Sequence, residues 1–258
     1  MSSSMFTKAI VRRPARSLIK GISAHPELGL PDYALAQRQH DAYIAALERC
    51  GLTVEVLPAL EAYPDSCFVE DVAVCTRNFA LITRPGAASR AGETAGMRDI
   101  LSKHYKIIEG IEAPGTLEGG DVMMVANSFY IGLSSRTNAE GAAQFIRLLD
   151  RHGLNGHTVA MPATLHLKTG MSYMEDGILL VDRAFSEHEE FNGFSWIDIA
   201  PDESYAANCL RINDYVIVPV GYPKALAAIQ ARGLKTITVD MSEYRKIDGG
   251  LSCLSLRF

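Results

Sequence analysis

A strand–turn–strand–helix–strand pattern recurs along this chain and limits its possible folds more than any other feature. Polar residues or a cysteine recur near the start of the first strand in each unit, at intervals of 50, 45, 42 and 45 residues: Asp71, Asp121, His166, Asn208 and Cys253. Repeats of this length are typical of solenoids and propellers. The fifth unit begins at Cys253, and only five residues follow it in the sequence.

The start of the chain can supply the missing parts of this fifth unit. Phe6–Arg12 and Thr53–Leu57 are predicted strands, and Tyr33–Cys50 is a predicted helix. The last residues, Leu254–Phe258, are too apolar for a frayed tail, and a closed ring would remove exposed strand edges. We therefore predict an α/β fold, a five-bladed β/α propeller of ββαβ repeats whose fifth blade combines both terminal segments.

This prediction treats residues 1–258 as a single domain, with residues 1–4 as an extension before it. A generic α/β or α+β domain with accidental regularity is the alternative. The predicted first strands of the units cover residues 67–75, 121–125, 166–173, 207–212 and the segment from 253 onward. Predicted helices cover 93–105, 139–152 and 224–232, and the third unit has a short polar stretch in place of a helix. The loop 20–32 has no periodicity, which is typical of a lid or of a simply exposed connection.

Charge and composition exclude several classes of protein. A net charge of −5 gives no reason to expect nucleic acid or anionic membrane as a partner, and no segment has the ~18–20 continuous apolar residues of a membrane span. The N-terminus lacks the features of a signal peptide. Five cysteines is an odd count without a C-x-x-C pair, which favours a reduced, cytoplasmic protein without a structural metal.

In a ring, equivalent positions of the repeats lie at equivalent radii. If the first strands start at the axis, one central pocket gathers Glu70, Asp71, Glu118, Asp121, His166, Asn208 and Cys253. A cysteine with a histidine in reach is typical of nucleophilic catalysis, because thiolate is the attacking form and histidine can hold or return a proton.

The carboxylates in this group point to the kind of substrate. Near an acyl substrate they would repel the developing oxyanion, which needs hydrogen-bond donors. A guanidinium instead matches carboxylates with paired N–H donors, so Asp71 and Glu118 could hold it with its carbon facing Cys253. The positive charge of such a substrate would also favour the thiolate.

Each of these residues also has a structural interpretation. Cys253 could be a core residue and His166 a structural histidine, while Asp71 and Glu118 could serve as turn or cap residues. Arg90 and Arg136 suit a ligand carboxylate but could equally be solvated. The alternatives of a Zn²⁺ site and of a cysteine protease or acyltransferase are less favoured, because the ligand spacing is absent and the pocket is rich in acids.

Six segments resemble one known family. They are Phe-Val-Glu-Asp (68–71), Ile-Thr-Arg-Pro-Gly-Ala (82–87), Glu-Ala-Pro-Gly-Thr-Leu-Glu-Gly-Gly-Asp (112–121), Tyr-Ile-Gly-Leu-Ser-Ser-Arg-Thr-Asn (130–138), Leu-His-Leu-Lys-Thr-Gly (165–170) and residues 243–258. Together they are similar to bacterial dimethylarginine dimethylaminohydrolases over residues 5–258. These belong to the guanidine-modifying, or pentein, superfamily, whose fold is the five-bladed β/α propeller.

The resemblance implies hydrolysis of Nω,Nω-dimethyl-L-arginine and Nω-monomethyl-L-arginine to L-citrulline and dimethylamine or methylamine. It implies that Cys253 forms a covalent thiouronium intermediate, and that His166 protonates the leaving amine and then activates water. Glu118 and Asp71 would hold the guanidinium. Arg90 and Arg136 would bind the α-carboxylate of the substrate. Asp65 and the Ile247 carbonyl would bind its α-amino group, and Glu70 is a further predicted substrate-binding residue. Ile22 stands where the family has an apolar lid residue, often leucine.

The resemblance further implies a homodimer without a cofactor. Arginine or agmatine deiminase is the first alternative, although the close arginine deiminases carry an extra helical insertion that is absent from this sequence. A non-catalytic binding propeller is the second alternative, and it would need neither Cys253 nor His166.

Overall fold

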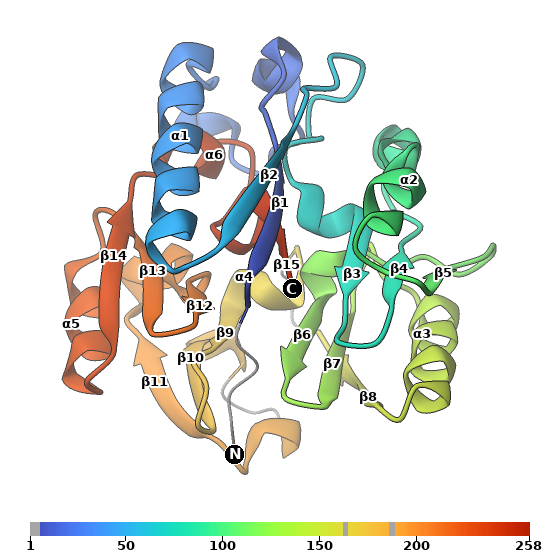
Figure 1. The fold of residues 1–258 in the computed structure, drawn as a ribbon. Coiled ribbons are helices and arrows are strands. Elements are labelled where there is room, and N and C mark those ends of the chain that lie inside the picture. Colours follow the sequence, from blue (N-terminus) through green and yellow to red (C-terminus); the bar gives the residue numbers. More distant parts are fainter. Residues whose placement is uncertain (1–5, 162–164, 186–188) are drawn as a thin grey trace.

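The computed structural model describes residues 6–161, 165–185 and 189–258, and within them the strands form five three-stranded sheets. In each sheet the middle strand pairs antiparallel with one neighbour and parallel with the other, and Figure 1 shows the sheets following one another around the centre of the molecule. The predicted extension 1–4 lies outside the described residues. No helix of the described chain is long and apolar enough to cross a membrane.

The sheets have the strand orders β15-β1-β2, β3-β4-β5, β6-β7-β8, β11-β10-β9 and β12-β13-β14. The strands are β1 Lys8–Arg12, β2 Thr53–Leu57, β3 Ala73–Cys75, β4 Ala80–Ile82, β5 Ile108–Gly110, β6 Val122–Val125, β7 Ser128–Leu133, β8 Asn155–Ala160, β9 Met171–Tyr173, β10 Ile178–Asp182, β11 Ser195–Ile199, β12 Leu210–Ile212, β13 Tyr215–Pro219, β14 Lys235–Val239 and β15 Ser255–Arg257. The helices are α1 Tyr33–Arg49, α2 Met97–Ser102, α3 Ala139–Arg151, α4 Leu167–Gly170, α5 Pro223–Ala231 and α6 Ser242–Arg245.

One sheet is built from both terminal segments, as predicted. Its central strand β1 pairs antiparallel with β15, where Ile10 faces Leu256, and parallel with β2, where Ile10 faces Glu55. Leu254 and Leu256 are buried in the core. The apolar C-terminal segment therefore serves as an edge strand of this sheet rather than as a tail.

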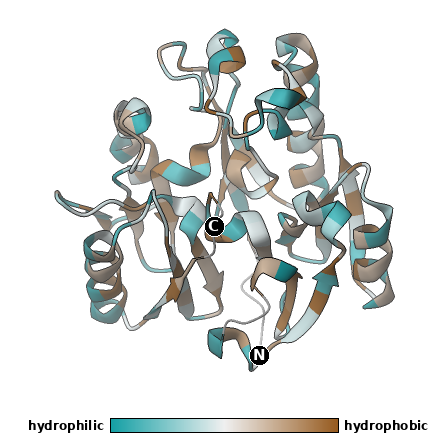
Figure 2. Ribbon diagram, turned by 180° about the vertical axis from the view of Figure 1, so that it is seen from behind, coloured by the Kyte–Doolittle hydropathy of each residue, from teal (hydrophilic) through white to brown (hydrophobic). Residues whose placement is uncertain are grey.

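The longer helices begin where the sequence supplies a capping side chain. Asp32 accepts a hydrogen bond from the Leu35 N–H at the start of α1, and Asn138 accepts one from the Gly141 N–H at the start of α3. Both helices bury one apolar face, on which Tyr43 of α1 is fully buried. Viewed from behind in Figure 2, these peripheral helices mix hydrophilic and hydrophobic residues, as expected of helices that cover a core on one side.

The first strands are shorter than predicted in all five units. Short helical turns replace their predicted beginnings: Val69–Val72, Gly119–Asp121, α4, Pro201–Ala207 and Ser252–Leu254. These turns are three to seven residues long, too short to show the periodicity that separates strands from helices in a sequence. The predicted helix 93–105 is also wrong in its bounds, because a 3₁₀ segment Ala88–Thr94 and the short α2 flank Gly96, whose φ is +78°.

His40 of α1 is an unusual member of the core. It is fully buried, and neither ring nitrogen has a hydrogen-bond partner among the described residues. Burial first, and then the charge of Arg13, lower the pKa of His40 to about 4.

This histidine predicts an acid-dependent loss of stability. The unfolded chain binds a proton at His40 near pH 6.5 but the folded chain binds it only near pH 4, so stability falls as pH falls through this window. A His40→Met variant should lose about 3 kcal/mol less free energy of unfolding between pH 7 and pH 4 than the unmodified chain. Urea unfolding at several pH values measures this difference, and parallel pH profiles of the two proteins would contradict the prediction.

Candidate active site

Short turns at the ends of different sheets bring together the residues that the sequence singled out. Asp71 lies in the turn Val69–Val72, Glu118 directly precedes the turn Gly119–Asp121, and Cys253 lies in the turn Ser252–Leu254. His166 precedes α4 and lies five residues before β9, whereas Asp71 and Cys253 lie two residues before their strands. The prediction that His166 occupies the same repeat position as Asp71 and Cys253 is therefore wrong by three residues. The His166 side chain nevertheless contacts Glu118.

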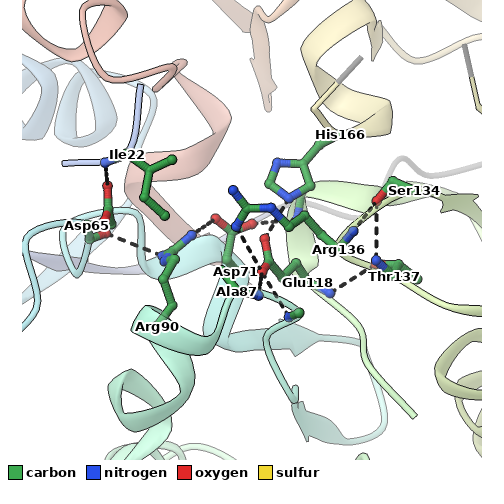
Figure 3. A network of polar contacts seen from close by, with 12 residues as sticks. Ile22, Asp65, Asp71, Ala87, Arg90, Glu118, Ser134, Arg136, Thr137 and His166 are labelled. Atoms are coloured by element: carbon green, nitrogen blue, oxygen red, sulfur yellow. Dashed lines mark hydrogen bonds and ion pairs between the residues drawn. The ribbon is translucent and has the colours of Figure 1, made fainter. Parts of the chain in front are cut away.

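His166 and Glu118 form the centre of the polar network in Figure 3. His166 Nε2 lies 2.7 Å from Glu118 Oε2, and both side chains are buried. Glu118 Oε1 accepts hydrogen bonds from the N–H groups of Gly86 and Ala87 at 3.0 and 3.3 Å. Burial alone would raise the pKa of Glu118, but the His166 hydrogen bond together with the charges of His166 and Arg90 lowers this pKa overall.

Asp71 is the second buried carboxylate of the network. Its Oδ1 accepts a hydrogen bond from the Gly120 N–H at 2.9 Å, and its Oδ2 pairs with Arg90. Burial opposes ionisation of Asp71, but His166 and Arg90 lower its pKa to about 2. A methyl group on Gly120 would lie 2.8 Å from the His166 ring and 2.9 Å from Asp71, so glycine permits this close packing.

These surroundings keep His166 charged. Burial would lower its pKa, but Asp71 and the hydrogen bond with Glu118 raise it to about 9, so the ring is an imidazolium at neutral pH. One polar atom each of Asp71, Glu118 and His166 lies within 4.8 Å of the others. Although such a set can in principle ligate a divalent metal, a protonated imidazole offers no lone pair for one.

Cys253 lines a small pocket together with Asp71 and His166. The lining residues are Ile22, Asp65, Phe68, Asp71, Arg90, Arg136, Leu165, His166, Ile247, Asp248, Gly249 and Cys253. The Gly250 N–H donates to Cys253 Sγ at 3.4 Å. Burial first, and then the charges of Glu70 and Asp71, raise the pKa of Cys253 to about 12, so the thiol is neutral at physiological pH.

The two arginines of the pocket differ in their existing partners. Arg90 is buried, pairs with Asp71 and Glu93, and also donates to the backbone carbonyls of Asp65 and Phe68. Arg136 has a longer contact, 3.5 Å from Nη1 to Glu118 Oε1. Sequence reasoning missed Glu93, although its position three residues after Arg90 is a common spacing for an ion pair.

The predicted lid residue packs beside the pocket. Asp65 Oδ1 accepts a hydrogen bond from the Ile22 N–H at 3.0 Å, and the Ile22 side chain remains 37% exposed. A methyl group on Gly21 would lie 3.0 Å from Asp65 and 3.1 Å from Ile247. Asp65, Ile22 and Ile247 therefore meet at one end of the pocket.

Glu70 does not line this pocket, which corrects its predicted placement. Its carboxylate pairs with Lys168 and Arg257, both at 2.6 Å, and accepts a hydrogen bond from Ser252 at 2.9 Å. It lines a separate cavity with these three residues. Consecutive residues of a helical turn point in different directions, so Asp71 faces the Cys253 pocket while Glu70 faces away.

Two other repeat positions support the site from outside it. Asp121 accepts hydrogen bonds from Ser134 Oγ, Thr137 Oγ1 and the Leu167 N–H, which fixes the start of α4 next to His166. Asn208 accepts a hydrogen bond from the Ser252 N–H at 2.9 Å and so holds the turn that carries Cys253. Asp71, His166 and Cys253 thus border the pocket as predicted, whereas Asp121 and Asn208 do not line it, and Glu118 lies behind His166.

Comparison with known proteins identifies the family. A family model described as N,N dimethylarginine dimethylhydrolase, eukaryotic, matches residues 32–253. An N(G),N(G)-dimethylarginine dimethylaminohydrolase of Pseudomonas aeruginosa is 52% identical over 98% of this chain and 100% of its own length. One of Streptomyces coelicolor is 36% identical over 97% of this chain and 96% of its own length.

Solved structures agree with these sequence matches. A cysteine-to-serine mutant of the Pseudomonas aeruginosa enzyme complexed with citrulline has a TM-score of 0.97 at 52% identity, covering 98% of this chain and 100% of that one. The N-terminal domain of ArgZ has a TM-score of 0.85 at 16% identity over 97% of each chain, which shows a shared α/β fold alone. The matching family model and the two relatives show that this chain belongs to the dimethylarginine dimethylaminohydrolase family.

Proposed function

We propose that this protein hydrolyses Nω,Nω-dimethyl-L-arginine and Nω-monomethyl-L-arginine to L-citrulline and dimethylamine or methylamine. The observation that carries the proposal is the pocket in which Cys253 lies with His166, Asp71 and two arginines. The names of the similar enzymes and the citrulline in the Pseudomonas aeruginosa complex support this choice of substrate.

Substrate binding prepares the nucleophile in this proposal. Asp71 and Glu118 hold the guanidinium with its carbon facing Cys253. The pKa of the free thiol is about 12, and the substrate's positive charge lowers it by stabilising the thiolate. Because Asp71 both raises the pKa of the thiol and binds the cation, thiolate forms only where substrate is present.

Two displacement steps then complete the reaction. The Cys253 sulfur bonds to the guanidinium carbon, the bond from that carbon to the methylated nitrogen breaks, and the amine leaves with a proton from the His166 imidazolium. This gives a thiouronium on Cys253. His166, now neutral, takes one proton from water, whose oxygen bonds to the same carbon. The carbon–sulfur bond then breaks as the remaining water proton passes to the departing sulfur, which releases citrulline and the Cys253 thiol.

The amino-acid end of the substrate lies at the other end of the pocket. Arg136 and Arg90 are proposed to bind the α-carboxylate, while Asp65 and the Ile247 carbonyl bind the α-amino group. Arg136 has the greater freedom to do so, since Arg90 already holds Asp71 and Glu93. Ile22 covers this end as a lid residue.

We also propose that the five sheets are the blades of a closed propeller. Contacts between the first strands of neighbouring sheets, β15 with β3, β6 with β9 and β9 with β12, support this arrangement. A cytoplasmic location is proposed because all five cysteines are unpaired. The homodimer implied by the resemblance stays a prediction, which light scattering of the purified protein would test.

Product analysis tests the proposed function. Incubation with Nω,Nω-dimethyl-L-arginine should yield citrulline and dimethylamine in equal amounts. If the protein instead converts arginine to citrulline and ammonia, or releases ammonia from agmatine, the same site is that of a deiminase. Absence of turnover with every guanidine tested would overturn the enzymatic proposal and favour a binding propeller.

A further inference from the structure

Asp248 lines the pocket with a backbone conformation that few residues adopt. Its φ is +58°, in the left-handed region that glycine favours and that aspartate and asparagine tolerate best among the others. It follows α6 and lies between Ile247 and Gly249, which also line the pocket. The sequence thus places an acidic side chain where glycine would fit with less strain.

The two carboxylate oxygens of Asp248 have different surroundings. Oδ2 accepts a hydrogen bond from the Ala24 N–H at 2.7 Å. Oδ1 is shielded from solvent and accepts no hydrogen bond from any described residue. A shielded carboxylate oxygen without a donor is unfavourable, so a donor supplied by a ligand would be bound strongly there.

Asp65 makes a parallel contact to the same loop. It accepts the Ile22 N–H, while Asp248 accepts the Ala24 N–H two residues further along. Between them, Ser23 Oγ donates to the Lys246 carbonyl at 2.7 Å. Residues 22–24, which we call the lid segment, are therefore held beside the pocket by two acids that line it, and Ile22 of this segment lines the pocket as well.

We propose that Asp248 Oδ1 accepts a hydrogen bond from the α-ammonium group of the substrate and, with Asp65, makes the enzyme select amino acids over guanidines that lack this group. The inference rests on the proposed function and adds a residue to its amino-group site. Bound substrate would then be tied to the lid segment through Asp248, since the other oxygen of the same carboxylate holds Ala24.

The charges around Asp248 suit this role. Burial raises the pKa of Asp248, and the hydrogen bond from Ala24 and the charge of Arg136 counteract this rise. Arg136 is also the proposed ligand of the α-carboxylate. An α-amino acid carries its ammonium and carboxylate on one carbon, so an acid and an arginine lining one small pocket match both groups at once.

Asp248→Asn is the variant that separates the two oxygens. Asparagine tolerates the left-handed backbone, and its carbonyl oxygen can still accept the Ala24 N–H. Its NH₂ group replaces the unpartnered oxygen and cannot accept a hydrogen bond from an ammonium. Asp240→Asn is the matched control, because Asp240 is exposed and outside the pocket.

The measured quantity is kcat/KM for Nω,Nω-dimethyl-L-arginine divided by that for its analogue without the α-amino group, the Nω,Nω-dimethyl derivative of 5-guanidinopentanoate. Asp248→Asn should lower this ratio about tenfold to a hundredfold, and Asp240→Asn should not change it. An unchanged ratio would overturn the proposal. If the ratio is unchanged because kcat/KM falls equally for both substrates, Asp248 acts through the lid segment or the fold alone.

Product binding separates this proposal from the proposed function. Calorimetry with L-citrulline and with 5-ureidopentanoate, which lacks the amino group, requires no turnover. The unmodified protein should bind citrulline more tightly, and Asp248→Asn should reduce that preference. Failure of the unmodified protein to prefer citrulline would contradict the role of Asp248, whatever the outcome of the activity assay.

Discussion

Replacing Cys253 with serine is expected to lower kcat for Nω,Nω-dimethyl-L-arginine by roughly 10³-fold or more. The substrate's positive charge can bring a thiol with a pKa of about 12 within reach of ionisation, but a serine hydroxyl is a far weaker acid and nucleophile. Substrate and citrulline should still bind, because the residues that hold the guanidinium are unchanged. Citrulline and dimethylamine formation, with mass spectrometry of the protein, measures the loss of turnover and of the covalent adduct.

Cys75→Ser is the matched control for this experiment. Cys75 is a partly buried free thiol that does not line the pocket of Cys253. It should retain activity and should still show an adduct on Cys253. If Cys253→Ser retains activity, Cys253 is not the nucleophile, even where the predicted substrate is correct.

Replacing His166 with alanine is expected to lower kcat for the methylated arginines by about 10²- to 10⁴-fold. The variant loses the imidazolium that protonates the leaving amine and the base that activates water. Because burial is opposed by Asp71 and Glu118, the unmodified ring has a pKa of about 9 and carries the required proton at neutral pH.

A substrate with a better leaving group isolates the first of these roles. S-methyl-L-thiocitrulline releases methanethiol, a leaving group that needs no general acid at neutral pH. His166→Ala should therefore still form an adduct with it on Cys253 but should hydrolyse that adduct slowly, so the adduct accumulates. Mass spectrometry at successive times follows this, with the exposed His157→Ala as a control. Rapid release of citrulline by His166→Ala would contradict the second role of the histidine.

Much of the architecture could be predicted from the sequence because local signals repeat. The hairpins of apolar strands joined by turn residues recur, and the apolar C-terminal residues required burial next to a distant strand. The sheet β15-β1-β2 confirms that requirement. What could not be predicted is the helical turn before each first strand, because a turn of three to seven residues is too short to show a helical period.

The candidate site was predictable where residue chemistry is distinctive. A cysteine, a histidine and acids at repeated positions pointed to one pocket, and Asp71, His166 and Cys253 do border it. The direction of neighbouring side chains was not predictable. Glu70 and Asp71 are adjacent acids, yet one pairs with Lys168 and Arg257 in a separate cavity and the other binds Arg90.

The sequence by itself determined the repeat, the pairing of the two termini and the kinds of chemical group available at the centre. Only the tertiary structure decided the electrostatic state of those groups. The pKa of His166 rises because Asp71 and Glu118, from other turns, surround it, while the pKa of Cys253 rises because it is buried near Glu70 and Asp71. Such shifts depend on distance and burial among residues far apart in the chain, which one-dimensional order does not contain.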